Sequence, residues 1–98
     1  MRRTVEWDVR LHLYEEDGTT RARAVLDAGT HTLTGHGTAR CNPEDVDVPE
    51  IGDELAAGRA MEHLAGQLMR VADRDLESVG AGAPADRRTA YGWSDAMS

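Results

Sequence analysis

The sequence predicts an α+β domain, in which a three-stranded antiparallel meander packs on one long C-terminal helix in the order β-β-β-α. Residues 5–14 and 20–26 alternate apolar and polar side chains, which is the period of a half-buried strand. Residues 50–76 instead repeat apolar side chains at three- and four-residue steps, which places them on one side of a helix. We expect one sheet-plus-helix domain over residues 1–79 and a flexible tail over 80–98.

The first predicted strand has one dry face and ends at a tight turn. Its apolar positions are Val5, Trp7, Val9, Leu11 and Leu13. The pair Asp17-Gly18 follows, and both residue types tolerate a positive φ, so we expect a hairpin there.

The second and third strands are predicted to supply small inward side chains. Ala22, Ala24 and Leu26 face inward in the second strand, and Leu33, Gly35, Gly37, Ala39 and Cys41 in the third, which spans residues 30–41. Two glycines on one strand face commonly mark a close backbone approach. We expect them to form the floor under the helix.

The helix is predicted to begin at Pro49 and to end near Ser78, with Gly80 as its stop. Glycine inside a helix costs roughly 1 kcal/mol relative to alanine. Gly58 lies on the apolar side, and we expect close packing to explain it.

The core of this 98-residue chain must be thin, because phenylalanine is absent. The apolar arc of the helix covers close to half its circumference, which is more than one three-stranded sheet can cover. This predicts a symmetric homodimer, joined through the helices, a strand edge or both. The predicted interface residues on the helix are Ile51, Leu55, Met61, Leu64, Leu68 and Met69.

Charge argues against non-specific nucleic-acid binding. The formal net charge is −7, lysine is absent, and all eleven basic residues are arginines. Residues 1–41 balance six arginines against six acidic residues, whereas residues 42–98 carry the whole excess of acid. An acidic chain is repelled by phosphate at long range, but a local arginine face can still contact a particular RNA or protein surface.

The sequence indicates a cytoplasmic protein with no membrane segment. Its single cysteine, Cys41, cannot form an intramolecular disulfide, which fits a reducing compartment. No apolar run approaches the length of a membrane span, and the N-terminus leads into alternating residues rather than a signal-peptide core.

No residue pattern predicts catalysis, a metal or a cofactor. The four histidines, His12, His31, His36 and His63, lack the close spacing of zinc ligands. Cys41 sits at a strand end with no adjacent base, so a small half-buried side chain describes it better than a nucleophile. We therefore expect a non-enzymatic protein with no catalytic residues, cofactor, metal or small-molecule substrate.

The outward face of the sheet is the best candidate for binding. The side chains predicted to line it are Arg10, His12, Arg21, Arg23, His36 and Arg40. Such a face suits RNA or an acidic protein surface, because arginine hydrogen-bonds phosphate and carboxylate well. The alternative is a solvated face in which Arg10 and Arg23 pair with Glu6 and Asp8 across strands.

Four segments carry a family resemblance: LYEEDGTTRA at 13–22, GHGTAR at 35–40, NP at 42–43 and VPEIGDELA at 48–56. Over residues 4–78 the chain resembles the small actinobacterial proteins grouped as a domain of unknown function, with a fold related to the double-stranded-RNA-binding domain. The resemblance implies a three-stranded sheet packed on a helix, dimers, and no established catalytic residues.

The shape of that family is also similar to ribosome hibernation factors, which is an analogy of fold alone. Our leading hypothesis is therefore a dimeric binding protein associated with the ribosome or RNA in stress or dormancy adaptation. The alternative is a protein–protein interaction module with no nucleic-acid role.

Overall fold

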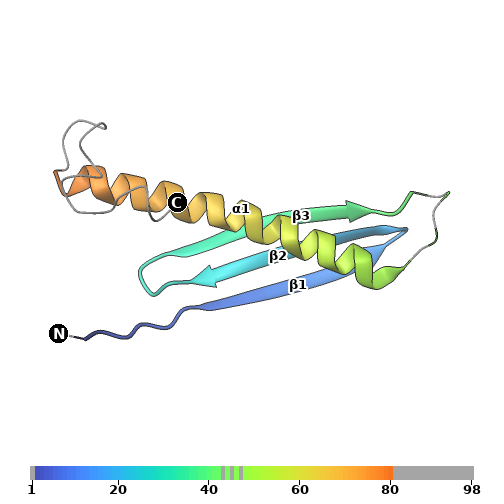
Figure 1. The fold of residues 1–98 in the computed structure, drawn as a ribbon, viewed down its shortest axis with the longest axis horizontal. Helices are drawn as coiled ribbons and strands as arrows, with labels where there is room; N and C mark the ends of the chain where they lie inside the picture. The colour runs from blue at the N-terminus through green and yellow to red at the C-terminus, as the bar shows by residue number, and fades with distance from the viewer. Residues whose placement is uncertain (1, 43, 45, 47, 81–98) are drawn as a thin grey trace. The chain divides into compact units, whose positions relative to one another are not determined.

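Three antiparallel strands followed by one long helix make up the fold (Figure 1). The computed structural model describes residues 2–42, 44, 46 and 48–80. The elements are β1 (Asp8–Glu16), β2 (Thr19–Asp27), β3 (Thr32–Arg40) and α1 (Pro49–Ser78), and the strand order is β1-β2-β3. This confirms the predicted fold class.

The β1–β2 hairpin closes on the predicted two-residue turn. Asp17 and Gly18 have φ values of 53° and 76°, and Glu16 pairs with Thr19 across the turn. The strand begins at Asp8 rather than at Val5 because β2 ends at Asp27, the residue opposite Asp8. Residues 5–7 therefore have no strand beside them.

Small side chains form the core between the sheet and the helix. The buried apolar residues up to residue 67 are Ala22, Ala24, Leu26, Ala39, Ala56, Ala60 and Leu64. A Cβ built on Gly35 would lie 2.6 Å from the backbone nitrogen of Leu64, and one on Gly37 would lie 2.9 Å from the backbone carbonyl carbon of Arg59. The two glycines are thus the floor under the helix, as the sequence predicts, because only a bare backbone lets α1 approach this closely.

The helix bounds also agree with the sequence. α1 begins at Pro49 and ends at Ser78, and Gly80 follows with a φ of 79°. The chain divides into two compact units. Residues 1–67, which include the sheet, form the first unit, and residues 68–98 form the second unit. The predicted tail, apart from Gly80 itself, lies outside the described residues.

Gly58 is not explained by close packing, contrary to the sequence prediction. A Cβ at this exposed position would meet nothing within 4 Å. We therefore expect Gly58→Ala to raise the free energy of unfolding by about 0.5–1 kcal/mol, because alanine loses less backbone entropy in a helix. Chemical denaturation followed by circular dichroism measures the change, and a loss of stability would contradict it.

The dry face predicted for the first strand is not buried in the protomer. All nine residues of β1 are exposed, because α1 packs over β2 and β3. Val9, Leu11 and Leu13 pair with Leu26, Ala24 and Ala22 and so share their face of the sheet, but they remain 42%, 43% and 39% exposed. The row formed by Val9, Leu11 and Leu13, on the helix side of the sheet, is thus left uncovered.

The two edges of the sheet differ. Along β3, the Arg59 Nη1 donates to the Thr38 carbonyl at 2.8 Å and the Gln67 Nε2 donates to the Thr34 carbonyl at 2.5 Å. The His36 backbone N–H donates to the Nδ1 of His63 at 2.9 Å. Three helix side chains one turn apart therefore occupy backbone groups that a further strand would need, which is one way proteins protect an edge.

Candidate functional site

All six residues predicted for the binding face lie on the side of the sheet away from α1. Ala22 and Ala24 are buried under the helix, so their neighbours Arg21 and Arg23 point to the opposite face. Residues that pair across strands point to the same face, so the pairing shows which residues of β1 and β3 share the face of Arg21 and Arg23. We call this surface the open face. It comprises Arg10, His12, Tyr14, Arg21, Arg23, His36, Thr38 and Arg40.

The register arranges these side chains in rows across the strands. His12 lies opposite Arg23, which lies opposite His36 on the other side. The next row contains Tyr14, Arg21 and Thr38. Residues in such rows have Cβ atoms about 4.5–5.5 Å apart, which brings two guanidinium groups, two imidazoles and a phenol into one surface.

These two rows border a shallow hollow of about 420 Å³ on the open face. All six predicted side chains are exposed, and Tyr14 is 59% exposed. A shallow surface offering planar and cationic groups can hold an extended or flat partner. It lacks the depth that encloses a small substrate.

The alternative pairing predicted for this face does not match the register. Arg10 lies opposite Val25, and Arg23 lies between His12 and His36. Asp8 instead faces Asp27, at the end of the sheet farther from the β1–β2 turn. Acidic side chains therefore border the arginines along the strands and do not face them across the strands.

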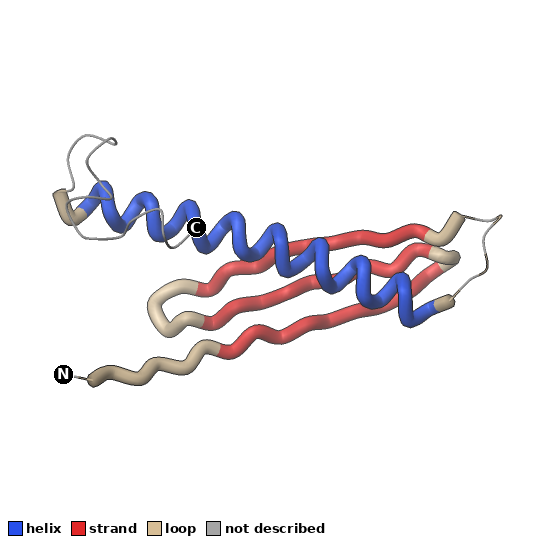
Figure 2. Tube along the Cα trace, in the orientation of Figure 1, coloured by secondary structure: helices blue, strands red, loops and turns tan. Residues whose placement is uncertain are grey.

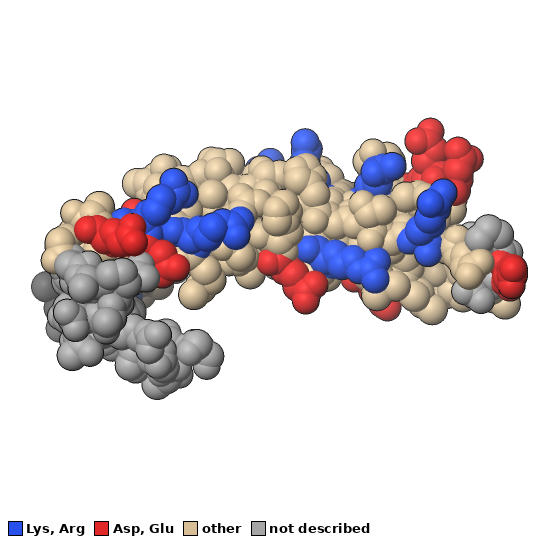
Figure 3. Space-filling view, turned by 90° about the horizontal axis from the view of Figure 1, so that it is seen from above, with Lys and Arg blue, Asp and Glu red and all other residues tan. Residues whose placement is uncertain are grey.

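Charge on the side of the molecule seen in Figure 3 is mixed. Some arginine side chains there lie next to one another and others are separated by neutral surface, and acidic side chains lie close to several of them. A surface of this kind offers no broad field of one sign to attract nucleic acid from a distance. On this side of the molecule, phosphate can therefore be bound only through a few local contacts.

The histidines do not assemble into a metal site within the described residues. No group of three or more His, Cys, Asp and Glu side chains in this part of the chain is placed to hold a metal ion. The rings of His36 and His63 are 6.2 Å apart, tilted by 43°, at the β3 edge. The bond that His63 Nδ1 accepts from the backbone gives it a structural role there.

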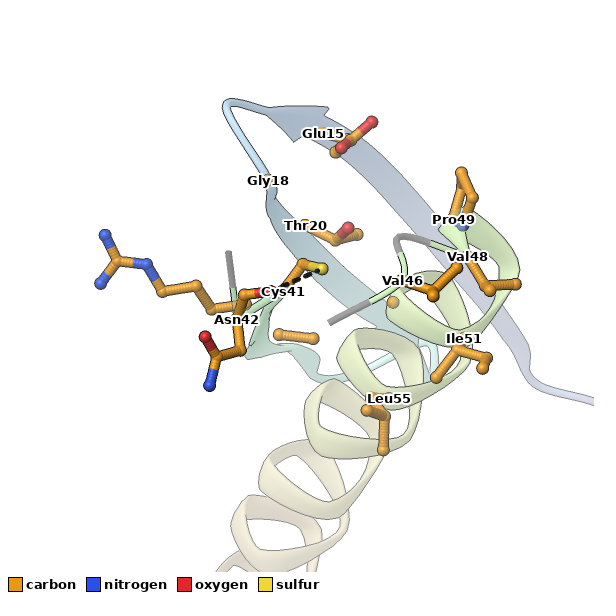
Figure 4. A pocket seen from close by; sticks show the side chains of 13 residues that line it. Glu15, Gly18, Thr20, Cys41, Asn42, Val46, Val48, Pro49, Ile51 and Leu55 are labelled. Atoms are coloured by element: carbon orange, nitrogen blue, oxygen red, sulfur yellow. Dashed lines mark hydrogen bonds between the residues drawn. The ribbon is translucent and has the colours of Figure 1, made fainter. Parts of the chain in front are cut away.

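A second hollow, of about 290 Å³, lies where α1 begins (Figure 4). Its walls are largely apolar, including Val48, Ile51 and Leu55, and Cys41 lies beside them. The Cys41 Sγ is 3.5 Å from the carbonyl oxygen of Asn42, and Glu15 stands on the far side of Thr20.

The residues predicted for a dimer interface differ in how far they are exposed. Leu64 is only 4% exposed and packs on its own sheet, whereas Ile51 and Leu55 are 53% and 47% exposed beside the second hollow. Met61, 40% exposed, lies two residues from both Arg59 and His63 and so on the opposite flank of the helix, toward β1. Leu68 and Met69 belong to the second unit, where Met69 is 62% exposed.

Sequence reasoning missed the side chains that cover the β3 edge. Arg59, His63 and Gln67 are four residues apart, and this spacing places them in one line along α1. That line of hydrogen-bonding side chains was the available signal, since a strand edge offers donors and acceptors along its length.

No helix among the described residues combines the length and apolar character that a bilayer crossing requires.

Comparison with known proteins gives consistent matches. A family model described as Rv2632c-like matches residues 5–85. The uncharacterized protein Mb1767 of Mycobacterium bovis is 44% identical over 73 residues, which cover 74% of this chain and 78% of that protein. The uncharacterized protein Rv2632c of Mycobacterium tuberculosis is 41% identical over 76 residues, covering 78% and 80%. The crystal structure of Rv2632c superposes with a TM-score of 0.75 at 34% identity, covering 84% of this chain and 98% of that one.

Proposed function

This chain belongs to the Rv2632c-like family, and from that premise we propose that it is a non-enzymatic cytoplasmic binding protein whose open face holds a folded RNA surface, such as that of an idle ribosome. The observation that supports the proposal best is the pair of adjacent rows His12–Arg23–His36 and Tyr14–Arg21–Thr38, uncovered on a sheet.

These side chains have the chemistry that RNA recognition uses. Guanidinium groups bind phosphate through two parallel hydrogen bonds, and they also stack on bases. Exposed tyrosine and histidine rings provide planes for unpaired bases, a mode that sheet-surface RNA-binding domains employ. Arg21 and Arg23 lie on the central strand with Tyr14 and His12 beside them, so one partner can contact all four at once.

The rest of the charge limits how much RNA the face can contact. Asp8 and Asp27 end the face on one side, and Glu16 shares a row with Thr19 and Arg40 on the other. With a net charge of −7, the chain is repelled by phosphate outside the central rows. We therefore expect weak, selective binding with a shallow dependence on salt, because each phosphate contact contributes a slope of roughly −0.7 to −0.9.

The alternative function is a protein–protein interaction module with no nucleic-acid role. The acidic borders of the open face favour it, since a protein partner can present carboxylates to the arginines and basic groups to the borders. Such a partner would bind this protein in the absence of RNA, whereas the ribosome hypothesis requires RNA for binding.

The test is salt-dependent co-sedimentation with ribosomes. Arg21→Glu with Arg23→Glu should lower association at low salt by about tenfold or more, because two attractive phosphate contacts become repulsive. The matched control is Arg70→Glu with Arg74→Glu, which makes the same charge change at exposed helix positions away from the open face. It should retain binding.

Two outcomes would reject the RNA hypothesis. One is the absence of ribosome association of the unaltered protein at low salt. The other is an equal loss of binding in the open-face and helix variants, which would indicate a response to net charge alone.

A further inference from the structure

The outer edge of β1 carries no recorded hydrogen bond in the described part of the chain, unlike the β3 edge that α1 covers. The hairpin geometry tells which residues present backbone groups there. Glu16 and Thr19 flank a two-residue turn and so form a hydrogen-bonded pair, and such pairs recur at every second residue. The N–H and C=O groups of Val9, Leu11 and Leu13 therefore point outward.

Backbone groups alternate along every strand between pointing toward and away from a neighbouring strand. For β3 this alternation is consistent with the hydrogen bonds that α1 makes. It places the backbone groups of Thr34, His36 and Thr38 on the outer edge of β3, where Arg59, His63 and Gln67 bond them. The assignment of the β1 edge thus agrees with an independent set of contacts.

An uncovered apolar row runs along the helix side of this open edge. Val9, Leu11 and Leu13 are about two-fifths exposed, and Trp7 and Val5, which precede the strand, are 50% and 57% exposed. Figure 2 shows the segment before β1 continuing along the line of that strand with no strand beside it. An exposed strand edge joined to an apolar row is a surface that proteins normally pair or cover.

We propose that β1 and the preceding residues 5–7 pair antiparallel with the same segment of a second copy of this chain, about a two-fold axis at Val9. In this register Val9 faces Val9 of the partner subunit, Trp7 faces the partner's Leu11, and Val5 faces the partner's Leu13. Every residue of the apolar row then meets another apolar residue, and residues 5–7 gain the strand neighbour that β2 cannot give them.

Charges on the other face of the strand favour this register. Asp8 faces the partner's Arg10, and Glu6 faces the partner's His12, with each pair formed twice. Within one chain Asp8 lies opposite Asp27, a repulsive pair, so an incoming arginine has an uncompensated carboxylate to bind.

Other two-fold registers fit less well. An axis at Arg10 sets two arginines against each other. An axis at Leu11 sets Arg10 opposite the partner's His12 and Asp8 opposite the partner's Tyr14, with no ion pair. The two-fold axis at Val9 is therefore the one at which both the charges and the apolar residues of the two copies match.

The pairing does not depend on the proposed RNA binding. The apolar row lies on the helix side of the sheet, and of the open-face arginines only Arg10 takes part in the pairing. Joining two copies edge to edge would form one six-stranded sheet and set two open faces next to each other. Loss of pairing and loss of ribosome association are measured separately, so either can fail alone.

Charge reversal tests the register without endangering the fold. Asp8→Arg places opposite charges across from Asp27 within the chain, so the protomer should be at least as stable, yet it sets arginine against the partner's Arg10. We expect Asp8→Arg and Arg10→Asp each to raise the dimer dissociation constant by about tenfold. The double variant Asp8→Arg with Arg10→Asp should restore it. Sedimentation velocity across a concentration series measures all four proteins.

Cysteine cross-linking provides a second, positional test. In a Cys41→Ser background, Val9→Cys should form an intermolecular disulfide on mild oxidation, because only the residue on the axis meets itself across the pair. Leu11→Cys in the same background is the matched control and should remain unlinked, since it faces the partner's Trp7.

Three results would overturn the proposal. The unaltered protein could be monomeric at tens of micromolar concentration, which would leave the β1 edge for a different protein. Cross-linking could favour Leu11→Cys over Val9→Cys. Finally, the double charge reversal could fail to restore association while the protomer remains folded.

Discussion

Gly37→Ala is expected to lower the free energy of unfolding by about 3 kcal/mol. A Cβ at Gly37 would collide with the backbone of Ala56 and Ala60 and would lie 2.9 Å from the carbonyl carbon of Arg59. Backbone atoms of a helix cannot move individually, so α1 must lift from the sheet and open the buried alanine layer. Urea denaturation followed by circular dichroism measures the loss.

Gly58→Ala is the matched control for this experiment. It adds the same methyl group to the same helix–sheet unit at a position with open space around it, so the two substitutions should change stability in opposite directions. Equal effects of the two substitutions would mean that close approach of α1 to β3 is not what Gly37 provides.

Removing the side chains that cover β3 should have the second-largest effect. Arg59→Ala with Gln67→Ala should lower the free energy of unfolding by about 2 kcal/mol, because the Thr38 and Thr34 carbonyls each lose a hydrogen bond. The bare edge should also promote self-association. Thermal unfolding measures the first change, and light scattering at increasing concentration measures the second.

The control is Glu62→Ala with Arg70→Ala, which alters two exposed charged residues of the same helix. It should change stability by less than about 0.5 kcal/mol and leave scattering unchanged. If the edge variant scattered no more light than this control, the bonds along β3 would contribute stability but no protection of the edge.

Periodicity in the sequence was sufficient to predict which residues share a face. Alternation from Val5 to Leu13 and from Ala22 to Leu26, together with the two glycines of β3, led to the correct number and order of strands, the hairpin and the helix floor, although β1 and β3 are shorter than predicted. The same parity predicted that all six arginine and histidine positions of the open face lie together. These features depend on local geometry, which is the information that a sequence period contains.

What could not be predicted is how far across the sheet one helix reaches. Gly35 and Gly37 both lie on β3, and they draw α1 toward that strand and away from β1. The row Val9, Leu11 and Leu13 therefore has the pattern of a buried face while being exposed. Gly58 was misjudged for a related reason, since a helix period identifies a side of the helix but not the atoms that meet it.

The bonds that Arg59, His63 and Gln67 make with β3 also determine how large any sheet built from this chain can become. Strand addition at that margin is blocked, so only the β1 margin can accept a neighbour. Two copies joined there would present a blocked margin at each end, and no third copy could add a strand. Pairing at the β1 margin alone would therefore limit an otherwise fibril-prone meander to a particle of finite size.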